Sequence, residues 1–156
     1  MDCESLASCA ADMAGRAAEF VEGVGARLPL DYSVGSLRVV DRIVDGLRQG
    51  GGGREDVAGA LFGLGAYVGQ VLVRQAGAVW VDLPDGHLLR PVFRYPVAVR
   101  MPDGRLWNPL GRTVNRFEIG PKESLHLYFL TLHGRRSARA RRPLPRIPDG
   151  ASGRAC

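Results

Sequence analysis

Cysteine and histidine are scarce, and their placement argues against the protein classes that depend on them. The three cysteines, Cys3, Cys9 and Cys156, all lie near the ends of the chain. An odd number without a regular spacing argues against a disulfide-stapled secreted domain, so we predict free thiols and a cytoplasmic protein. The three histidines form no zinc-binding spacing with the cysteines, so we expect no metal and no cofactor.

Long apolar runs are also missing, with one borderline case. The segment from Val57 to Val73 is uncharged, but its 17 residues lie at the lower limit of what can span a bilayer. It also holds four glycines. We therefore predict a buried helix inside the protein and no membrane span. The first residues, Met1 to Glu4, lack the basic and apolar regions of a signal peptide.

The recognisable motifs of nucleotide binding and nucleophilic catalysis are absent too. The run from Gly50 to Gly53 lacks the Lys-Ser/Thr of a phosphate-binding loop, and the glycines between 63 and 69 do not match the dinucleotide fingerprint. No Gly-x-Ser-x-Gly elbow occurs. Ser124 and His126 are neighbours, but on a helix they would point to different faces. We therefore expect no catalytic residues.

Lysine is nearly absent, and the positive charge that arginine supplies is unevenly spread. Residues 134–156 hold seven arginines and one aspartate, whereas residues 1–133 have a net charge of −1. A near-neutral body attracts polyanions poorly. We predict one globular domain over residues 1–133 and a disordered arginine-rich tail over residues 134–156, which has too few apolar side chains to offset the entropy of ordering.

Apolar residues at intervals of three and four predict three helices in the first half of the chain. The first covers residues 3–26, the second begins after Ser33 as N-cap and ends before Gly50, and the third runs from about Glu55 to Gln75. We expect the third helix to be the most buried. Its four glycines would let a sheet or another helix approach closely. These glycines are Gly59, Gly63, Gly65 and Gly69.

From Gly77 onwards the apolar residues no longer follow the helical period, and strand-like runs separated by turns predict an antiparallel meander of three or four strands. The strands cover residues 78–83, 88–94 and 96–101, with an extension at 105–107. Turns of the Pro-Asp-Gly type separate them at residues 84–87 and 102–104. Pro91 would make the second strand an edge strand or a bulge.

Two short helices are predicted after the strands. Asn108 is suited to an N-cap and Pro109 to the first helical position, which predicts a helix to about Ile119. The segment from Glu123 to His133 predicts a last helix, with a strand as the alternative because its apolar residues also alternate. The predicted fold class is therefore α+β, with N-terminal helices, an antiparallel three- to four-stranded meander and short C-terminal helices.

Arginine and aromatic residues gather in the predicted sheet. Protein-binding surfaces are rich in arginine and aromatic residues, so this cluster predicts a partner-binding site. Its residues are Arg90, Arg94, Tyr95, Arg100, Arg105 and Trp107. The alternative is an ordinary amphipathic sheet, with Trp80, Phe93 and Trp107 in the core and the arginines outside.

The tail offers a second candidate surface. Its arginines could bind a polyanion weakly and in a salt-dependent way. They are Arg135, Arg136, Arg139, Arg141, Arg142 and Arg146. The alternative is a solvated end without a role.

Three groups of residues also suggest a resemblance. They are Leu30 to Leu37 with Val40-Asp41, Leu64 to Gly69 with Trp80, and Pro109 with the segment from Glu123 to Leu125. Over roughly residues 28–133 the chain resembles an uncharacterised bacterial domain family of actinobacterial type. The resemblance implies shared packing positions and no catalytic residue. Domains of this kind sometimes occur near toxin-immunity and interaction genes, which favours a binding role.

These patterns predict a protein-interaction or regulatory binding module, with an immunity-like protein as one form, which has no catalytic activity and an unidentified protein partner. One alternative is a nucleic-acid-associated protein that uses the basic tail. The other is an enzyme without a recognisable motif, for which Asp82 and Asp103 are the best candidates. Turn chemistry explains carboxylates near such turns more simply.

Overall fold

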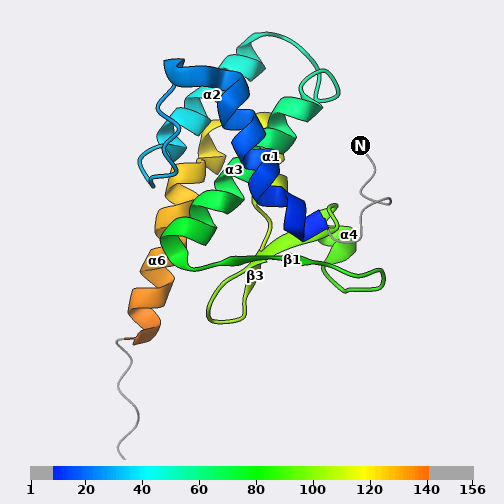
Figure 1. Ribbon diagram of the computed structural model, residues 1–156, viewed down its shortest axis with the longest axis vertical. Coiled ribbons are helices and arrows are strands. Elements are labelled where there is room, and N and C mark those ends of the chain that lie inside the picture. Colours follow the sequence, from blue (N-terminus) through cyan, green and yellow to red (C-terminus); the bar gives the residue numbers. More distant parts are fainter. Residues whose placement is uncertain (1–8, 141–156) are drawn as a thin grey trace, which may run out of the picture.

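Helices make up most of the protein, and a small sheet lies across one end of them (Figure 1). The computed structural model describes residues 9–140, and the side chains of residues 9–132. In chain order the elements are α1 (Cys9–Val24), η2 (Gly25–Arg27), α2 (Leu37–Gln49), α3 (Ala58–Ala76), β1 (Val79–Asp82), α4 (Arg90–Phe93), β2 (Val97–Arg100), β3 (Leu106–Trp107), α5 (Pro109–Ile119), η3 (Pro121–Glu123) and α6 (Leu125–Ala140). The predicted α+β class is confirmed, and the sheet has three strands.

Helix α3 is the centre of the fold, as its glycines predicted. Eleven of its residues are buried, more than in any other helix whose side chains are described. Three of the four glycines lie against other elements: Gly63 against Phe20 of α1, Gly65 against Leu110 of α5, and Gly69 against the indole of Trp80 in β1. A Cβ on Gly65 would come within 2.9 Å of the Cα of Leu110. Gly59 has open space around it, so packing does not explain that glycine.

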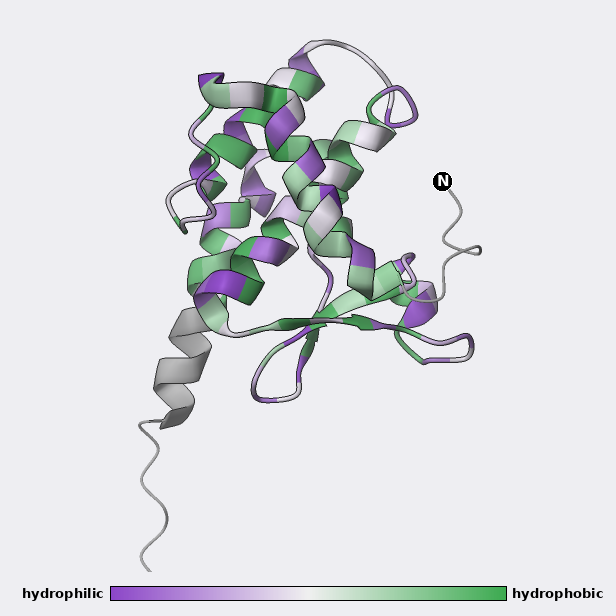
Figure 2. Cartoon of the chain, viewed as in Figure 1, coloured by the Kyte–Doolittle hydropathy of each residue, from purple (hydrophilic) through white to green (hydrophobic). Residues whose placement is uncertain are grey.

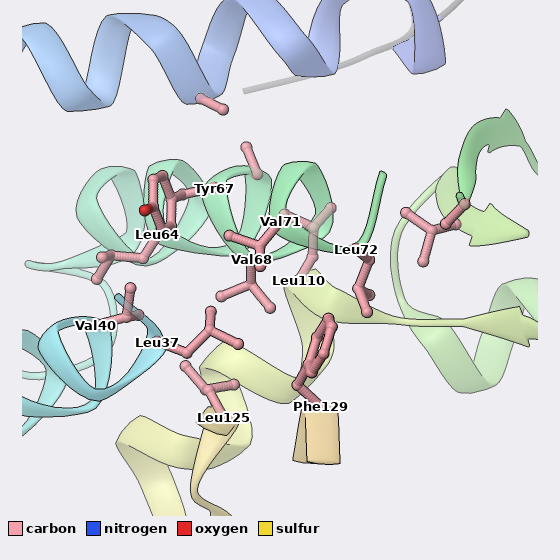
Figure 3. Close-up of a cluster of buried hydrophobic side chains, with 14 of the residues drawn as sticks. Leu37, Val40, Leu64, Tyr67, Val68, Val71, Leu72, Leu110, Leu125 and Phe129 are labelled. Carbon is pink, nitrogen blue, oxygen red and sulfur yellow. The ribbon is translucent and has the colours of Figure 1, made fainter. Parts of the chain in front are cut away.

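A large part of the core forms where α2, α5 and α6 meet α3, and α1 packs on α3 as well. Figure 3 shows Leu37 and Val40 of α2, Leu110 of α5, and Leu125 and Phe129 of α6 around the buried side chains of α3. Figure 2 shows that α1 and α2 carry both apolar and polar residues, as amphipathic helices do. Among the described helices, none is both long enough and apolar enough to cross a bilayer.

The sheet is antiparallel, with β2 in the middle. β1 pairs with β2 from Val79↔Arg100 to Asp82↔Val97, and β2 pairs with β3 at Val99↔Trp107. Gly86 and Gly104 have φ values of +85° and +84°, so the two predicted turns use glycine for its left-handed conformation.

The strand predicted at residues 88–94 is wrong, because this segment forms the short helix α4. Pro91 lies in the first turn of α4, where a missing N–H costs nothing. Arg94 ends the helix in the left-handed conformation, with φ +62°, and its N–H donates to the carbonyl of Arg90. The chain therefore turns back before β2 and does not extend the sheet.

The helix starts are confirmed in part. Asn108 Oδ1 accepts a hydrogen bond from the N–H of Gly111 at 2.9 Å, so the predicted N-cap of α5 is present. Ser33 caps a turn through Ser36 N, at 3.1 Å, and α2 begins only at Leu37. The last segment is a helix, as preferred to a strand, and it continues past His133 to Ala140. The disordered tail was predicted over residues 134–156, but residues 134–140 belong to α6. The rest of that prediction, residues 141–156, lies outside the described residues.

One prediction about cysteine is wrong. Cys9 is buried and disulfide-bonded, whereas we expected free thiols. The other two cysteines, Cys3 and Cys156, lie outside the described residues. The spacing of three cysteines near the chain ends did not reveal the pairing, because a disulfide depends on the distance between Cα atoms in the folded chain.

Candidate binding cleft

A cleft of about 350 Å³ lies between α4, the start of α5 and the loop before α3. Both apolar and cationic side chains line it. Its residues are Arg54, Val92, Phe93, Arg94, Tyr95, Asn108, Gly111, Arg112, Val114 and Asn115. The volume is at the lower end of the range for ligand sites.

Asn108 joins the two walls of the cleft. Its Nδ2 donates to the carbonyl oxygen of Phe93 in α4 at 3.0 Å, while its Oδ1 caps α5 through Gly111. A Cβ on Gly111 would collide with the Asn108 side chain, so glycine is required there for this contact. The end of α4 and the start of α5 are therefore held together by one amide.

Three guanidinium groups reach the cleft, and two of them have carboxylate partners. Arg54 Nη1 lies 3.1 Å from Glu118 Oε1, and Arg112 Nη1 lies 2.7 Å from Glu123 Oε2. The side chain of Arg94 makes no ion pair or hydrogen bond within the part of the chain that the structure describes. No acidic residue is among those that line the cleft in the described part of the chain. One positive charge is left uncompensated.

Tyr95 lies in the field of these charges. Burial raises the pKa of its hydroxyl above the usual value, while the positive charges of Arg54 and Arg94 act in the opposite direction. Both guanidinium groups are therefore close enough to influence the phenol. Tyr95 can offer a protonated hydroxyl to a ligand at neutral pH.

The six residues of the predicted partner-binding site do not share one sheet, because residues 88–94 are not a strand. Only Arg94 and Tyr95 line the cleft. Arg90 Nη1 donates to the carbonyl of Leu83 at 2.6 Å and lies 3.1 Å from Asp85, so it holds the preceding loop. The remaining three lie on or beside the sheet.

Arg100 is exposed on β2, whereas Arg105 and Trp107 have partners inside the protein. Arg105 Nη2 lies 2.6 Å from Asp103 Oδ2, and the Arg105 guanidinium is 5.5 Å from the centre of the Trp107 ring. Trp107 packs against the core and meets Tyr128 edge to face at 5.5 Å. Trp80 also packs against the core, whereas Phe93 lines the cleft. A binding role for Arg90, Arg100, Arg105 and Trp107 stays a prediction.

Four polar residues that line the cleft were not predicted from the sequence as binding residues. They are Arg54, Asn108, Arg112 and Asn115. Asn108, Arg112 and Asn115 are four and three residues apart, which places them on one face of a helix. That spacing could have identified these three residues from the sequence as one polar surface. Arg54 follows a glycine run and has no local signal.

Only part of the predicted arginine-rich tail lies within the described residues. Arg135, Arg136 and Arg139 fall on the last turns of α6, in the stretch whose side chains are not described. Arg141, Arg142 and Arg146 lie outside the described residues. Polyanion binding by these arginines stays a prediction.

The carboxylates proposed for an enzyme do not form a pair. Asp82 is at the end of β1 that faces Val97, whereas Asp103 lies in the turn beyond Arg100, at the opposite end of the sheet. Asp82 accepts a hydrogen bond from the N–H of Ala10, and Asp103 binds Arg105. Within residues 9–132 no group of three His, Cys, Asp or Glu side chains could hold a metal ion.

Ser124 and His126 meet a common carboxylate, but not as a catalytic triad. Asp41 Oδ2 accepts a hydrogen bond from the Ser124 hydroxyl at 2.7 Å and from the main-chain N–H of His126 at 3.4 Å. A triad needs the carboxylate on the imidazole and the imidazole on the serine. Here the carboxylate caps the start of α6, so the arrangement is structural.

Comparison with known proteins gives no match. No family model, no curated protein and no solved structure matches this chain significantly. The resemblance to an actinobacterial-type domain family has no match to support it. Function must therefore be inferred from the chemistry of the cleft itself.

Proposed function

We propose that this protein is a binding module without catalytic activity, and that the cleft holds an acidic surface of a partner protein. The observation that carries the proposal is the guanidinium of Arg94, which has no partner in the described part of the chain and lies beside two arginines that already have carboxylate partners. An arginine without a partner among the described residues, at a cleft that no described acidic residue lines, is available to an external anion.

Exposed apolar residues in α4 and just before it favour a protein partner. Leu88 and Val92 are 89% and 70% exposed, and Val92 itself lines the cleft. Large apolar side chains next to arginine and tyrosine are typical of protein-binding hot spots. A nucleic acid would instead favour a broad positive surface, whereas residues 1–133 have a net charge of −1.

The proposal is tested by affinity capture from the extract of the native cell, with nuclease present. Full-length protein should retain a stoichiometric protein partner that Arg94→Gln loses. Arg38→Gln, which changes an exposed arginine on α2 outside the cleft, is the matched control and should retain it. Thermal unfolding of each variant shows that the fold survives.

Two results would contradict the proposal. If Arg94→Gln captures the partner as well as the parent protein does, the cleft is not the site. If the captured material disappears with nuclease, or when the six tail arginines are replaced by glutamine, the nucleic-acid alternative is correct. Arg100→Gln in the same series tests whether the sheet contributes to the site.

A further inference from the structure

We infer that the cleft takes a single carboxylate, supplied by an aspartate or glutamate of the partner that is flanked by an aliphatic residue. The inference rests on the proposed function and names its ligand. The carboxylate binds Arg94, and the aliphatic neighbour packs on Val92. A phosphate group fits the cleft less well than a carboxylate does.

The charge balance of the cleft selects a group with one negative charge. Arg54 and Arg112 are compensated by Glu118 and Glu123, which leaves the charge of Arg94 uncompensated among the residues that the structure describes. A carboxylate carries one charge and matches it. A phosphomonoester carries about −1.5 to −2 at neutral pH, so it would be fully compensated only if one of the two internal ion pairs opened.

The hydrogen-bonding groups of the cleft also fit a carboxylate. Asn108 is occupied at both ends of its amide, by Phe93 and by Gly111. The side chain of Asn115 makes no hydrogen bond within the described residues. It can therefore donate to a ligand, together with the Tyr95 hydroxyl and the guanidinium of Arg94. A guanidinium binds a carboxylate through two parallel hydrogen bonds.

The size and the walls of the cleft limit the ligand to a short segment. Its volume of about 350 Å³ corresponds to roughly ten water molecules, at about 30 Å³ each. Phe93 and Val114 supply apolar wall, and Val92 stands exposed at the cleft. Such a space accepts one or two side chains. A folded domain would contact the rim while one acidic side chain enters.

The test uses three blocked peptides and the full-length protein labelled with ¹⁵N. The probes are acetyl-Leu-Glu-Leu-amide, the same peptide with Gln in place of Glu, and the same peptide with phosphoserine. Titration is followed by the main-chain resonances of Arg94, Tyr95 and Asn115 and by the Arg94 Nε–H. The Glu peptide should shift these signals and bind about tenfold more tightly than the Gln peptide, since hydrogen bonds to charged groups add about 1.5–3 kcal/mol.

Variants decide whether the site is the cleft. Arg94→Gln should remove the preference for Glu over Gln, and Arg38→Gln should keep it. The inference is overturned if the Glu and Gln peptides bind equally, if the phosphoserine peptide binds as tightly as the Glu peptide, or if no resonance of the cleft moves.

Failure of this inference and failure of the proposed function give different results. If a partner is captured through Arg94 but the Glu peptide is not preferred, the proposed binding module is supported and the carboxylate ligand is contradicted. If the Glu peptide is preferred but no protein is captured, the carboxylate site is supported and the protein partner is contradicted.

Discussion

Asp41 of α2 and Arg116 of α5 form a buried ion pair, with Arg116 Nε 3.1 Å from Asp41 Oδ1. The same carboxylate accepts hydrogen bonds from the Ser124 hydroxyl and from the N–H of Leu125 at the start of α6. Asp41 therefore joins three helices. Arg116 is only 3% exposed, so its charge depends on this carboxylate and on Asp45 at 2.8 Å.

Asp41→Asn should lower the free energy of unfolding by about 3–5 kcal/mol, because it removes the less exposed of the two carboxylates that compensate the buried Arg116, together with the charged acceptor at the start of α6. Asp45→Asn is the matched control. Since Asp45 is 39% exposed, its loss should cost less than about 1 kcal/mol. Urea denaturation measures both. Equal effects of the two variants would contradict the role given to Asp41.

Gly69→Ala should destabilise the protein by about 1–3 kcal/mol, because its methyl group would occupy the space of the Trp80 indole. Gly59→Ala lies in the same helix with open space around it. That control should leave stability unchanged or raise it by up to about 1 kcal/mol. Thermal unfolding of the pair measures both, and a tolerated Gly69→Ala would contradict the close packing of α3 on the sheet.

Substitutions at position 94 test stability and ligand binding separately. Arg94 has a φ of +62°, which glycine adopts without strain and a β-branched residue does not. Arg94→Gly and Arg94→Val should both lose the preference for the Glu peptide. Arg94→Val should also be less stable than Arg94→Gly by about 1–2 kcal/mol. Peptide titration and denaturation of each variant give the two measurements, and equal stabilities would contradict the left-handed turn.

Two tyrosines should respond differently to the loss of a buried hydroxyl. Tyr67 Oη accepts from the N–H of Tyr32 at 2.8 Å and lies 2.6 Å from Ser36 Oγ. Tyr67→Phe should therefore cost about 1–3 kcal/mol. The hydroxyl of Tyr128 is buried and has no hydrogen bond within the described residues. Tyr128→Phe should change stability by less than about 0.5 kcal/mol, since no bond is lost.

The same hydroxyls predict a loss of stability in alkali. Burial raises the pKa of Tyr128 well above its usual value, although the nearby Arg112 acts in the opposite direction, and burial likewise raises the pKa of Tyr67. The protonated form is favoured in the folded state, so this stability is fully present below the ordinary tyrosine pKa of about 10 and declines above it. Denaturation at about pH 8 and pH 11 should show the decline, and Tyr128→Phe should reduce it. An unchanged decline would contradict the assignment to Tyr128.

Local patterns predicted the helices better than the strands. The cap at Asn108, the two Pro-Asp-Gly turns and the buried, glycine-rich α3 all follow from nearest neighbours along the chain. Residues 88–94 were misread because a run of seven residues is too short to separate a strand from a helical turn. The apolar residues at 88, 89, 92 and 93 are in fact spaced as on one face of a helix. The bond from Asn108 Nδ2 to Phe93, which holds the end of α4, comes from 15 residues away.

The candidate site was predicted only where its residues are adjacent. Arg94 and Tyr95 come from one local cluster, whereas Arg54 and Arg112 come from other parts of the chain. Their places depend on the packing of α5 against α3, where Gly65 lies against Leu110. No periodicity encodes which distant segments meet, because a helical face specifies what is buried and not against which partner it is buried.

The sequence by itself determined the positions of the main helices, the two glycine turns and the near-neutral charge of residues 1–133, since each depends on local propensity or on composition. Only the tertiary structure decided which charges are compensated. Arg54 meets Glu118 across 64 residues, and Arg112 meets Glu123 across 11. Coulomb energy depends on distance in space, so the uncompensated charge of Arg94 exists only in the folded protein.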